Sequence, residues 1–365
     1  METFFKPNKK AIYGLDPDKV FVGREITSNY NISIDESVHN MWNGFIPTSS
    51  YTENSAEFAG RLGFHQMFLP YGFLMNLTLS LAVENYTHSS LLHLELRNAL
   101  YLRPAFPGDT FTCSIKITGI RESTNGLNSI LESTHLLSNQ KGEPVFSLTR
   151  ITLFPRFEAR KTLSDNPSRS MHNHHFKEKI LARVRSITLD NPIPEFSPGD
   201  LLLHPYVRPI GKSENLFWAT FLKNSHPIHH NYQRYQPGEI VVSGGIVVAM
   251  VLGIASREFR QILLPEVKKA FHIAPVKAED RIGAFSFVKD VVQIMPGFEE
   301  ISIITYGLRN VDTERDLHEL AFPESLFQEI ARPSQVNMIL EQHCPELIDK
   351  LCCYVEWSVL RKNEN

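Results

Sequence analysis

Hydrophobic and polar positions along the chain follow a pattern that occurs twice. The segments FVGREITSNYNISIDESVHNMW and SPGDLLLHPYVRPIGKSENLFW each place a Gly 19 residues before a Trp. These residues are Gly23 and Trp42 in the first segment and Gly199 and Trp218 in the second. Each segment is followed by an apolar stretch that starts at a Gly, Gly72 or Gly244, and runs for about three helical turns without Pro or charge. A repeat of this kind predicts two copies of one folding unit.

Strand patterns follow each apolar helix. They read TCSIKITGI, SILESTHLL and PVFSLTRITLF in the first half, and AFSFVKDVVQI and ISIITYGL in the second. Turn residues at 139–142 and 310–313 separate such segments, as in antiparallel hairpins. A helix that is apolar on all sides must be wrapped, and a strongly curved antiparallel sheet can wrap it. The pattern predicts an α+β double hotdog fold, in which each repeat has a strand, a polar loop, an apolar helix and several further strands.

The repeat divides the chain into four parts. We expect an N-terminal hotdog at 1–157, a linker at 158–196, a C-terminal hotdog at 197–327 and a helical tail at 328–365. The linker is polar and charged, and only its end near 180–184 has a helical pattern. The tail has helical spacing interrupted by Pro333 and Pro345, and nothing in the first half corresponds to it.

Composition narrows the possible partners and compartments. Hydrophobic residues make up 42% and charged residues 21%, and 37 Lys and Arg face 40 Asp and Glu, a net charge of −3. Because there is no basic surplus, we expect no nucleic-acid partner. Four cysteines without a disulfide framework fit a reducing compartment, so the expected location is cytoplasmic. No signal-peptide pattern is present, and the apolar stretches are too short for a membrane span.

The start of the second apolar helix is a candidate binding site. Ser243, Gly244 and Gly245 open this helix, whose first N–H groups lack partners inside the helix and whose dipole favours negative charge. Gly244 leaves room for a carbonyl to approach, so developing charge on its oxygen can be stabilised there. The same glycines could instead serve close packing between the helix and the sheet.

Three segments carry a resemblance to a known family. The loop NSHPIHHN at 224–231, the SGG at 243–245 and LRPAFPGDTF at 102–111 resemble MaoC-type R-specific enoyl-CoA hydratases and dehydratases. The second half is most similar to the two-domain branch that includes mesaconyl-CoA hydratase, and the resemblance covers about 16–327. It implies an active loop Asp-x-Asn-x-x-His, whose outer residues act on a water molecule. It also implies that N–H groups at the start of the hotdog helix hold the thioester oxygen.

This resemblance assigns roles to the second-half loop. His229 stands at the family histidine, His226 at the intervening asparagine and Asn224 at the catalytic aspartate. A carboxamide can orient water but cannot accept its proton, so His229 would carry the acid–base chemistry largely alone. The first-half loop places Gly44 and Ser49 at the aspartate and histidine positions. We therefore expect the first half to accommodate the acyl group without catalysis.

The expected function is a hydro-lyase that adds or removes water across the α,β double bond of an acyl-CoA thioester. The candidate catalytic residues are His229, Asn224 and Gly244, and the candidate substrate-binding residues are Ser243, Gly245 and His226. The coenzyme A thioester is the substrate, and no further cofactor is expected. Since two hotdogs in one chain already supply the pairing that single hotdogs obtain by dimerising, a monomer or a homodimer is expected.

Other functions and sites have less support in the sequence. Because Asn224 replaces the family aspartate, the alternative is a catalytically impaired acyl-thioester binding protein. A hotdog thioesterase would need a carboxylate beside the carbonyl, and the helix at 244–255 offers none. His226, His229 and His230 have no Cys, Asp or Glu nearby in a recognised zinc-ligand spacing, so no metal site is expected.

Overall fold

The computed structural model describes residues 13–157, 173–185, 187 and 194–363. The first half contains β1 (Glu25–Thr27), β2 (Ile32–Ser33), α1 (Glu36–Phe45), α2 (Tyr51–Asn54), α3 (Ala56–Arg61), α4 (Tyr71–Leu81), β3 (Leu92–Tyr101), β4 (Thr110–Glu122), β5 (Asn128–Ser138) and β6 (Pro144–Pro155). The second half contains β7 (Leu201–Pro209), α6 (Lys212–Phe221), α7 (Gly244–Phe259), β8 (Ile262–His272), β9 (Arg281–Met295), β10 (Phe298–Arg309), α8 (Thr313–Asp316), α9 (Pro333–His343) and β11 (Leu351–Lys362). Helix α5 (His174–Val184) lies between the halves in sequence, and the π-helical turn Val83–Thr87 follows α4.

The strands form one continuous antiparallel sheet that both halves share. Its order is β1-β4-β5-β6-β3-β8-β11-β10-β9-β7, with β2 paired to β4. The two halves meet where β3 pairs with β8, for example Leu96 with Ala270. On either side of this junction the equivalent strands follow in the same order, so the sheet has an approximate two-fold symmetry. This is the repeated architecture that the sequence pattern predicts.

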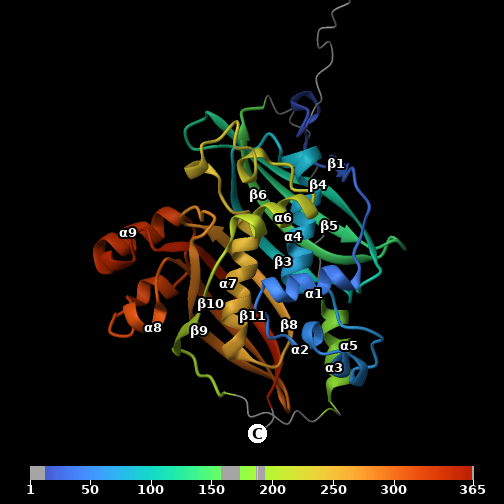
Figure 1. Cartoon of the computed structure of the whole chain (residues 1–365), viewed down its shortest axis with the longest axis vertical. Coiled ribbons are helices and arrows are strands. Elements are labelled where there is room, and N and C mark those ends of the chain that lie inside the picture. Colours follow the sequence, from blue (N-terminus) through green and yellow to red (C-terminus); the bar gives the residue numbers. More distant parts are fainter. Residues whose placement is uncertain (1–12, 158–172, 186, 188–193, 364–365) are drawn as a thin grey trace, which may run out of the picture.

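The two apolar helices, α4 and α7, lie side by side near the centre of the molecule (Figure 1). Residues 246–256 of α7 are all buried, because a helix without a polar face must be enclosed on every side. Asn76 of α4 joins the helices: its amide nitrogen donates to the carbonyls of Gly72 at 2.8 Å and of Gly245 at 2.9 Å. A Cβ on Gly72 would lie 3.0 Å from that of Ala249, so glycine permits this close packing.

The expectation of a wholly helical tail at 328–365 is wrong for its last part. Helix α9 (Pro333–His343) lies in the expected helical tail, but Leu351–Lys362 form strand β11 between β8 and β10. This is the place that β6 occupies between β3 and β5, so β11 has a counterpart in the first half after all. The second hotdog therefore extends beyond 327 and includes β11.

Burial explains why this strand resembles a helix in sequence. Both faces of β11 are covered, one by the main core and the other by residues from the segment between β10 and β11. Tyr354, for example, shares a buried cluster with Leu326 and Val336. A strand buried on both faces has no alternation of polar and apolar residues, so its pattern does not separate it from a buried helix.

Segments expected to be polar loops or linker also contain helices. Helices α1 and α6 precede the central helices, and each carries one of the repeated tryptophans. Trp42 and Trp218 are buried and meet edge to face, with ring centroids 4.9 Å apart. In the linker, 158–172 and 188–193 lie outside the described residues, while the expected helix near 180–184 is α5. Within the described part of the chain, no helix combines the length and hydropathy needed to cross a bilayer.

Candidate active site

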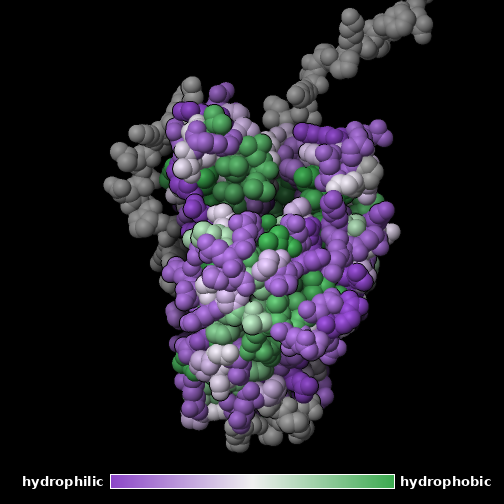
Figure 2. Space-filling model, turned by 90° about the vertical axis from the view of Figure 1, so that its left-hand side faces the viewer, coloured by the Kyte–Doolittle hydropathy of each residue, from purple (hydrophilic) through white to green (hydrophobic). Residues whose placement is uncertain are grey.

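A cavity of about 520 Å³ lies at the amino end of α7, between the two halves. The second half contributes the loop after α6, the start of α7 and the segment after β8. The first half contributes the end of α4, the turn that follows it, and side chains from β3 and β6. Seen from the side that carries α9, at the left of Figure 1, the molecular surface is hollowed, and hydrophobic side chains gather in the hollow (Figure 2).

All six residues proposed from the sequence line this one cavity. They are Asn224, His226, His229, Ser243, Gly244 and Gly245. The loop residues and the helix start are brought together by hydrogen bonds, such as the one from the Asn224 amide to the Ser243 hydroxyl at 3.4 Å. The structure therefore places the candidate imidazole and the candidate helix amides around one space large enough for an acyl group.

His229 has one ring nitrogen held and the other available. Its Nδ1 lies 2.9 Å from the carbonyl oxygen of Val241. Because a carbonyl only accepts, Nδ1 carries the proton and Nε2 keeps its lone pair. Burial lowers the pKa of His229 to about 4, so the ring is neutral at pH 7. A neutral imidazole with a free Nε2 can accept a proton from water.

His226 lies beside His229, with ring centroids 5.9 Å apart. Its Nδ1 accepts a long hydrogen bond of 3.4 Å from the Ile228 N–H. Burial and the neighbouring His229 lower its pKa to about 4. His226 is therefore also neutral. Its hydrogen bond with the Ile228 N–H helps to hold the turn of the loop, and its side chain lines the cavity.

Asn224 uses its side chain to hold the loop. Its Oδ1 accepts from the His226 N–H at 3.2 Å, and its Nδ2 donates to Ser243 Oγ. The side chain is 8% exposed, and this remaining exposure faces the cavity that it lines. A carboxylate here would accept from both partners and from water, whereas the amide has one acceptor oxygen and no basic site.

The start of α7 is closely surrounded. Ile246 and Val247 donate their N–H groups to the Ser243 carbonyl, at 2.9 and 3.2 Å. A Cβ on Gly244 would lie 2.4 Å from Nε2 of His272, and one on Gly245 would lie 2.4 Å from Oδ1 of Asn76. Glycine at 244 thus leaves room for the His272 ring, and glycine at 245 leaves room for the Asn76 side chain that joins α4 to α7.

Sequence reasoning missed three ionisable residues of the cavity: His93, Arg150 and His272. His272 faces Gly244, and burial lowers its pKa to about 4. A signal for it existed, because His272 precedes Pro275 by three residues as the buried Tyr101 precedes Pro104. Arg150 and His93 come from first-half strands, so only the pairing of the halves brings them to a second-half site.

The first half has a closed counterpart of this site at the start of α4. There the carboxylate of Glu53 accepts the Tyr71 N–H at 2.9 Å and the Thr48 hydroxyl at 3.1 Å. Glu53 is 2% exposed, and the adjoining cavity is only about 40 Å³. The sequence alignment of this loop was wrong: Glu53 faces the helix start, while Ser49 bonds to Ser256 at the far end of α7. The Glu53 carboxylate already accepts the Tyr71 N–H at the start of α4, so this position has no room for an acyl group.

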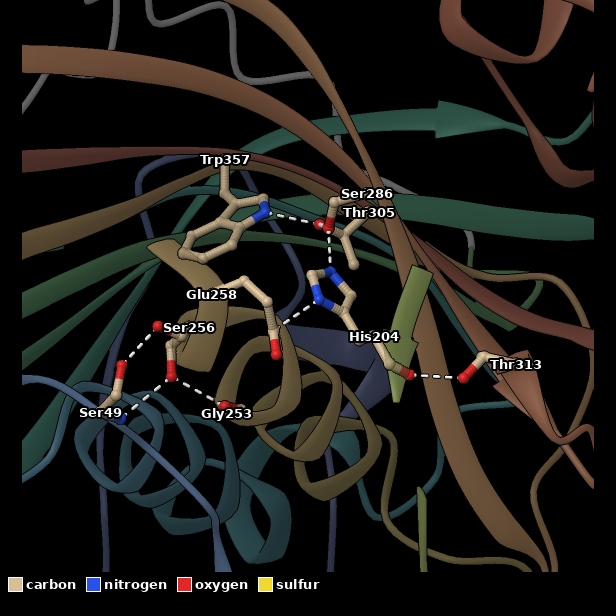
Figure 3. A network of polar contacts seen from close by, with 9 residues as sticks. All are labelled: Ser49, His204, Gly253, Ser256, Glu258, Ser286, Thr305, Thr313 and Trp357. Carbon is tan, nitrogen blue, oxygen red and sulfur yellow. Dashed lines mark hydrogen bonds and ion pairs between the residues drawn. The ribbon is translucent and has the colours of Figure 1, made fainter. Parts of the chain in front are cut away.

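A second polar cluster, under the carboxyl end of α7, resembles a Ser-His-Glu triad (Figure 3). His204 lies 2.6 Å from the Glu258 carboxylate and 2.7 Å from the Ser286 hydroxyl. The chain of bonds continues through Thr305 to the indole of Trp357. Ser286 is fully buried, and it lines neither the large cavity nor the small one beside Glu53. This cluster is therefore a structural network and offers no nucleophile to a substrate.

A metal site was also conceivable for the histidines of the loop. Among the residues that the structure describes, no three His, Cys, Asp or Glu side chains are grouped so that they could hold a metal ion. Three of the cavity imidazoles, His226, His229 and His272, are neutral and face a largely apolar lining.

Sequence comparisons show that the chain is similar to dehydratases and hydratases. Residues 21–148 match the family model "FAS1-like, dehydratase domain region", which lies in the half opposite the candidate loop. The mesaconyl-CoA hydratase of Cereibacter sphaeroides is 20% identical over 267 residues, which cover 68% of this chain and 76% of that protein. Both matches support the resemblance to MaoC-like proteins.

Comparisons of structure confirm the fold. A MaoC domain protein dehydratase from Chloroflexus aurantiacus J-10-fl superimposes with a TM-score of 0.75 at 15% identity, covering 98% of this chain and all of that one. A conserved hypothetical protein from Mycobacterium tuberculosis, described as a double hotdog fold, gives a TM-score of 0.65 at 13% identity, with 95% and 98% coverage. The predicted double hotdog fold and the resemblance to the MaoC-like family are thus confirmed.

Proposed function

We propose that this double hotdog protein, similar to MaoC-like hydratases and dehydratases, reversibly adds water across the α,β double bond of an acyl-CoA thioester. One observation carries the proposal: the free Nε2 of His229 and the open amino end of α7 belong to the same cavity. The chemistry needs both, because water must lose a proton while negative charge develops on the thioester oxygen.

The thioester oxygen would bind at the start of α7. The N–H groups of Gly244 and Gly245 have no acceptor within the helix, and the helix dipole favours negative charge there. In the first half the corresponding N–H donates to Glu53, so only the second half offers this position. Stabilising the negative charge of an enolate oxygen commonly contributes more to the rate of such reactions than any other single effect.

A single imidazole can complete the proton balance. In the hydration direction, His229 Nε2 accepts a proton from water as the hydroxide oxygen bonds to the β-carbon. The resulting imidazolium is held by the Val241 carbonyl and returns the proton to the α-carbon as the enolate collapses. The product gains one hydroxyl and one hydrogen, and His229 is restored to its neutral form.

Asn224 favours the second candidate function, a binding protein for acyl thioesters. Both ends of its amide are already engaged, and neither can take a proton from water. The cavity would then hold the same ligand without reacting with it. The two functions differ in turnover and share the acyl-CoA ligand.

Hydration of crotonyl-CoA tests the proposal, measured by loss of the enoyl absorbance. We expect turnover by the natural chain and a loss of about 10²- to 10⁴-fold in His229→Ala, because the one base is removed. His230→Ala is the matched control, since that neighbouring imidazole is not part of the cavity lining. Asn224→Asp should raise kcat by about tenfold or more by adding a second acid–base group.

Two results would change the conclusion. If the natural chain binds crotonyl-CoA without turnover and only Asn224→Asp is active, the binding function is correct. If His229→Ala retains the full activity of the natural chain, the catalytic assignment is wrong.

A further inference from the structure

The cavity wall contains an imidazole that the proposed hydration does not use. His272 is the last residue of β8 and lines the cavity at the amino end of α7. A Cβ on Gly244 would lie 2.4 Å from Nε2 of His272 and 3.1 Å from each of the two ring carbons beside Nε2. Because these two carbons are equally distant, the ring points its Nε2 directly at Gly244.

His272 has no hydrogen-bond partner among the residues that the structure describes. Burial is the only cause that lowers its pKa, and neither a charged group nor a hydrogen bond contributes. The ring is therefore neutral at pH 7, with one nitrogen that can donate and one that can accept. Polar groups away from water are normally hydrogen-bonded, so an unpartnered imidazole in a cavity wall indicates a polar ligand atom beside it.

The repeat explains why this imidazole lacks a partner. The buried Tyr101 stands at the equivalent position of the first half, and its hydroxyl donates to the Leu69 carbonyl. Leu69 and Val241 each lie three residues before the glycine of their central helix. The Val241 carbonyl, however, accepts from His229. His229 thus uses the acceptor that the first half gives to Tyr101, and His272 remains available to a ligand.

We propose that His272 donates a hydrogen bond from Nε2–H to the thioester oxygen at the start of α7, which makes it a further catalytic residue of the proposed hydration. The inference rests on that proposed function and adds a side-chain donor to the N–H groups of Gly244 and Gly245. A neutral imidazole can donate here without losing its proton. The hydrogen bond strengthens as negative charge develops on the oxygen, so it stabilises the transition state more than the bound substrate.

Infrared spectroscopy of a bound thioester tests this contact without any turnover. Butyryl-CoA, isotopically labelled at the thioester carbonyl carbon, is bound to the natural chain, to His272→Gln and to His272→Met. Gln and Met side chains are similar in length and shape, but only Gln can donate a hydrogen bond. We expect binding to the natural chain and to His272→Gln to move the carbonyl stretch to lower wavenumber. His272→Met should lose part of this shift.

Turnover of crotonyl-CoA is the second readout. His272→Met should lower kcat by about 10²-fold with little change in KM, because a donor to the developing negative charge is removed. His272→Gln should keep kcat within about tenfold of the natural value. Tyr101→Phe is the matched control, because it removes the hydroxyl at the equivalent first-half position, outside the cavity lining. It should change neither kcat nor the carbonyl stretch of bound butyryl-CoA.

Three outcomes would overturn the proposal. In the first, the carbonyl stretch of bound butyryl-CoA is the same in the natural chain and in His272→Met. In the second, His272→Gln loses as much activity as His272→Met. In the third, Tyr101→Phe changes the carbonyl stretch as much as His272→Met does.

Failure of the proposed function gives a different result. If butyryl-CoA binds with the expected dependence of its carbonyl stretch on His272 but crotonyl-CoA is not hydrated, the hydration is wrong and the hydrogen bond to the thioester oxygen is correct. If no acyl-CoA binds, both proposals are wrong.

Discussion

At the scale of single residues, desolvation sets the chemistry of the cavity. His226, His229 and His272 each have a pKa lowered to about 4, and burial is the largest cause for each. They are neutral rings at pH 7, and each can accept or donate a proton according to the tautomer that its partners impose. For His229 the Val241 carbonyl imposes the tautomer in which Nε2 carries no proton.

This environment predicts the pH dependence of activity. Because the pKa of His229 is about 4, kcat/KM for crotonyl-CoA should be constant from about pH 8 to pH 5 and should fall at lower pH as the base is protonated. The measurement is a pH profile of kcat/KM with thermal unfolding followed at each pH. An acidic limb centred near 6.5 in a folded protein would mean that His229 is not the desolvated base.

Some residues of the cavity can be predicted from the sequence, and others cannot. The loop at 224–231 and the start of the second apolar helix are adjacent motifs in one half, so their joint site was predicted. Arg150 and His93 belong to strands of the other half. Their place in the cavity lining depends on how β3 meets β8, which no local sequence pattern shows.

At the scale of elements, the two central helices differ at their amino ends. The start of α7 opens on the large cavity, while the start of α4 is capped by the buried carboxylate of Glu53. Burial raises the pKa of Glu53 to about 7, so this carboxyl group is partly protonated at neutral pH. The first half thus fills with its own side chain the position that the second half offers to a ligand.

Glu53→Gln should change the pH dependence of stability. The pKa of Glu53 rises from 4.5 in the unfolded chain to about 7 in the folded one, so its stabilising effect is complete below pH 4.5 and is lost as pH rises through 7. The free energy of unfolding of Glu53→Gln, minus that of the natural chain, should therefore increase between pH 4.5 and 8 by on the order of 3 kcal/mol.

Denaturant unfolding at several pH values measures this difference, in which the histidine contributions common to both proteins cancel. Glu57→Gln is the control, because that side chain is exposed. Parallel curves for Glu53→Gln and the natural chain would contradict the assigned pKa.

The elements that sequence predicts best are strands buried on one face and long helices buried on all sides. The alternating pattern of β5 and the unbroken apolar run of α7 each match the structure. Strand β11 was missed because both of its faces are buried. Helices α1 and α6 were expected as polar loops, since each buries only a narrow stripe around its tryptophan.

At the scale of the whole molecule, the two halves are joined along the sheet and through the aromatic contact of Trp42 with Trp218. These residues occupy equivalent positions in the repeat, so the contact lies close to the approximate two-fold axis. Its stabilising effect couples the halves, and neither half alone can make it.

A double-mutant cycle on Trp42→Leu and Trp218→Leu should reveal this coupling. We expect an interaction energy of about 0.5–1.5 kcal/mol beyond the sum of the single effects, as for edge-to-face aromatic pairs. Denaturant unfolding of the four proteins provides the values. Phe154→Leu combined with Trp218→Leu is the control, because Phe154 contacts Tyr86 and Phe157 within the first half. Strict additivity for the tryptophans would show that the halves are not coupled here.

The placement of β11 bears on the order in which the two halves fold. Strand β6 joins β5 across the short turn at 139–142, whereas β11 must return to β10 across the whole of 310–350. Closing a longer loop costs more entropy before its contacts are gained, and non-local pairing slows folding. The half that carries the candidate loop should therefore reach its native state after the half that does not, because β8 and β10 are joined only once β11 pairs between them.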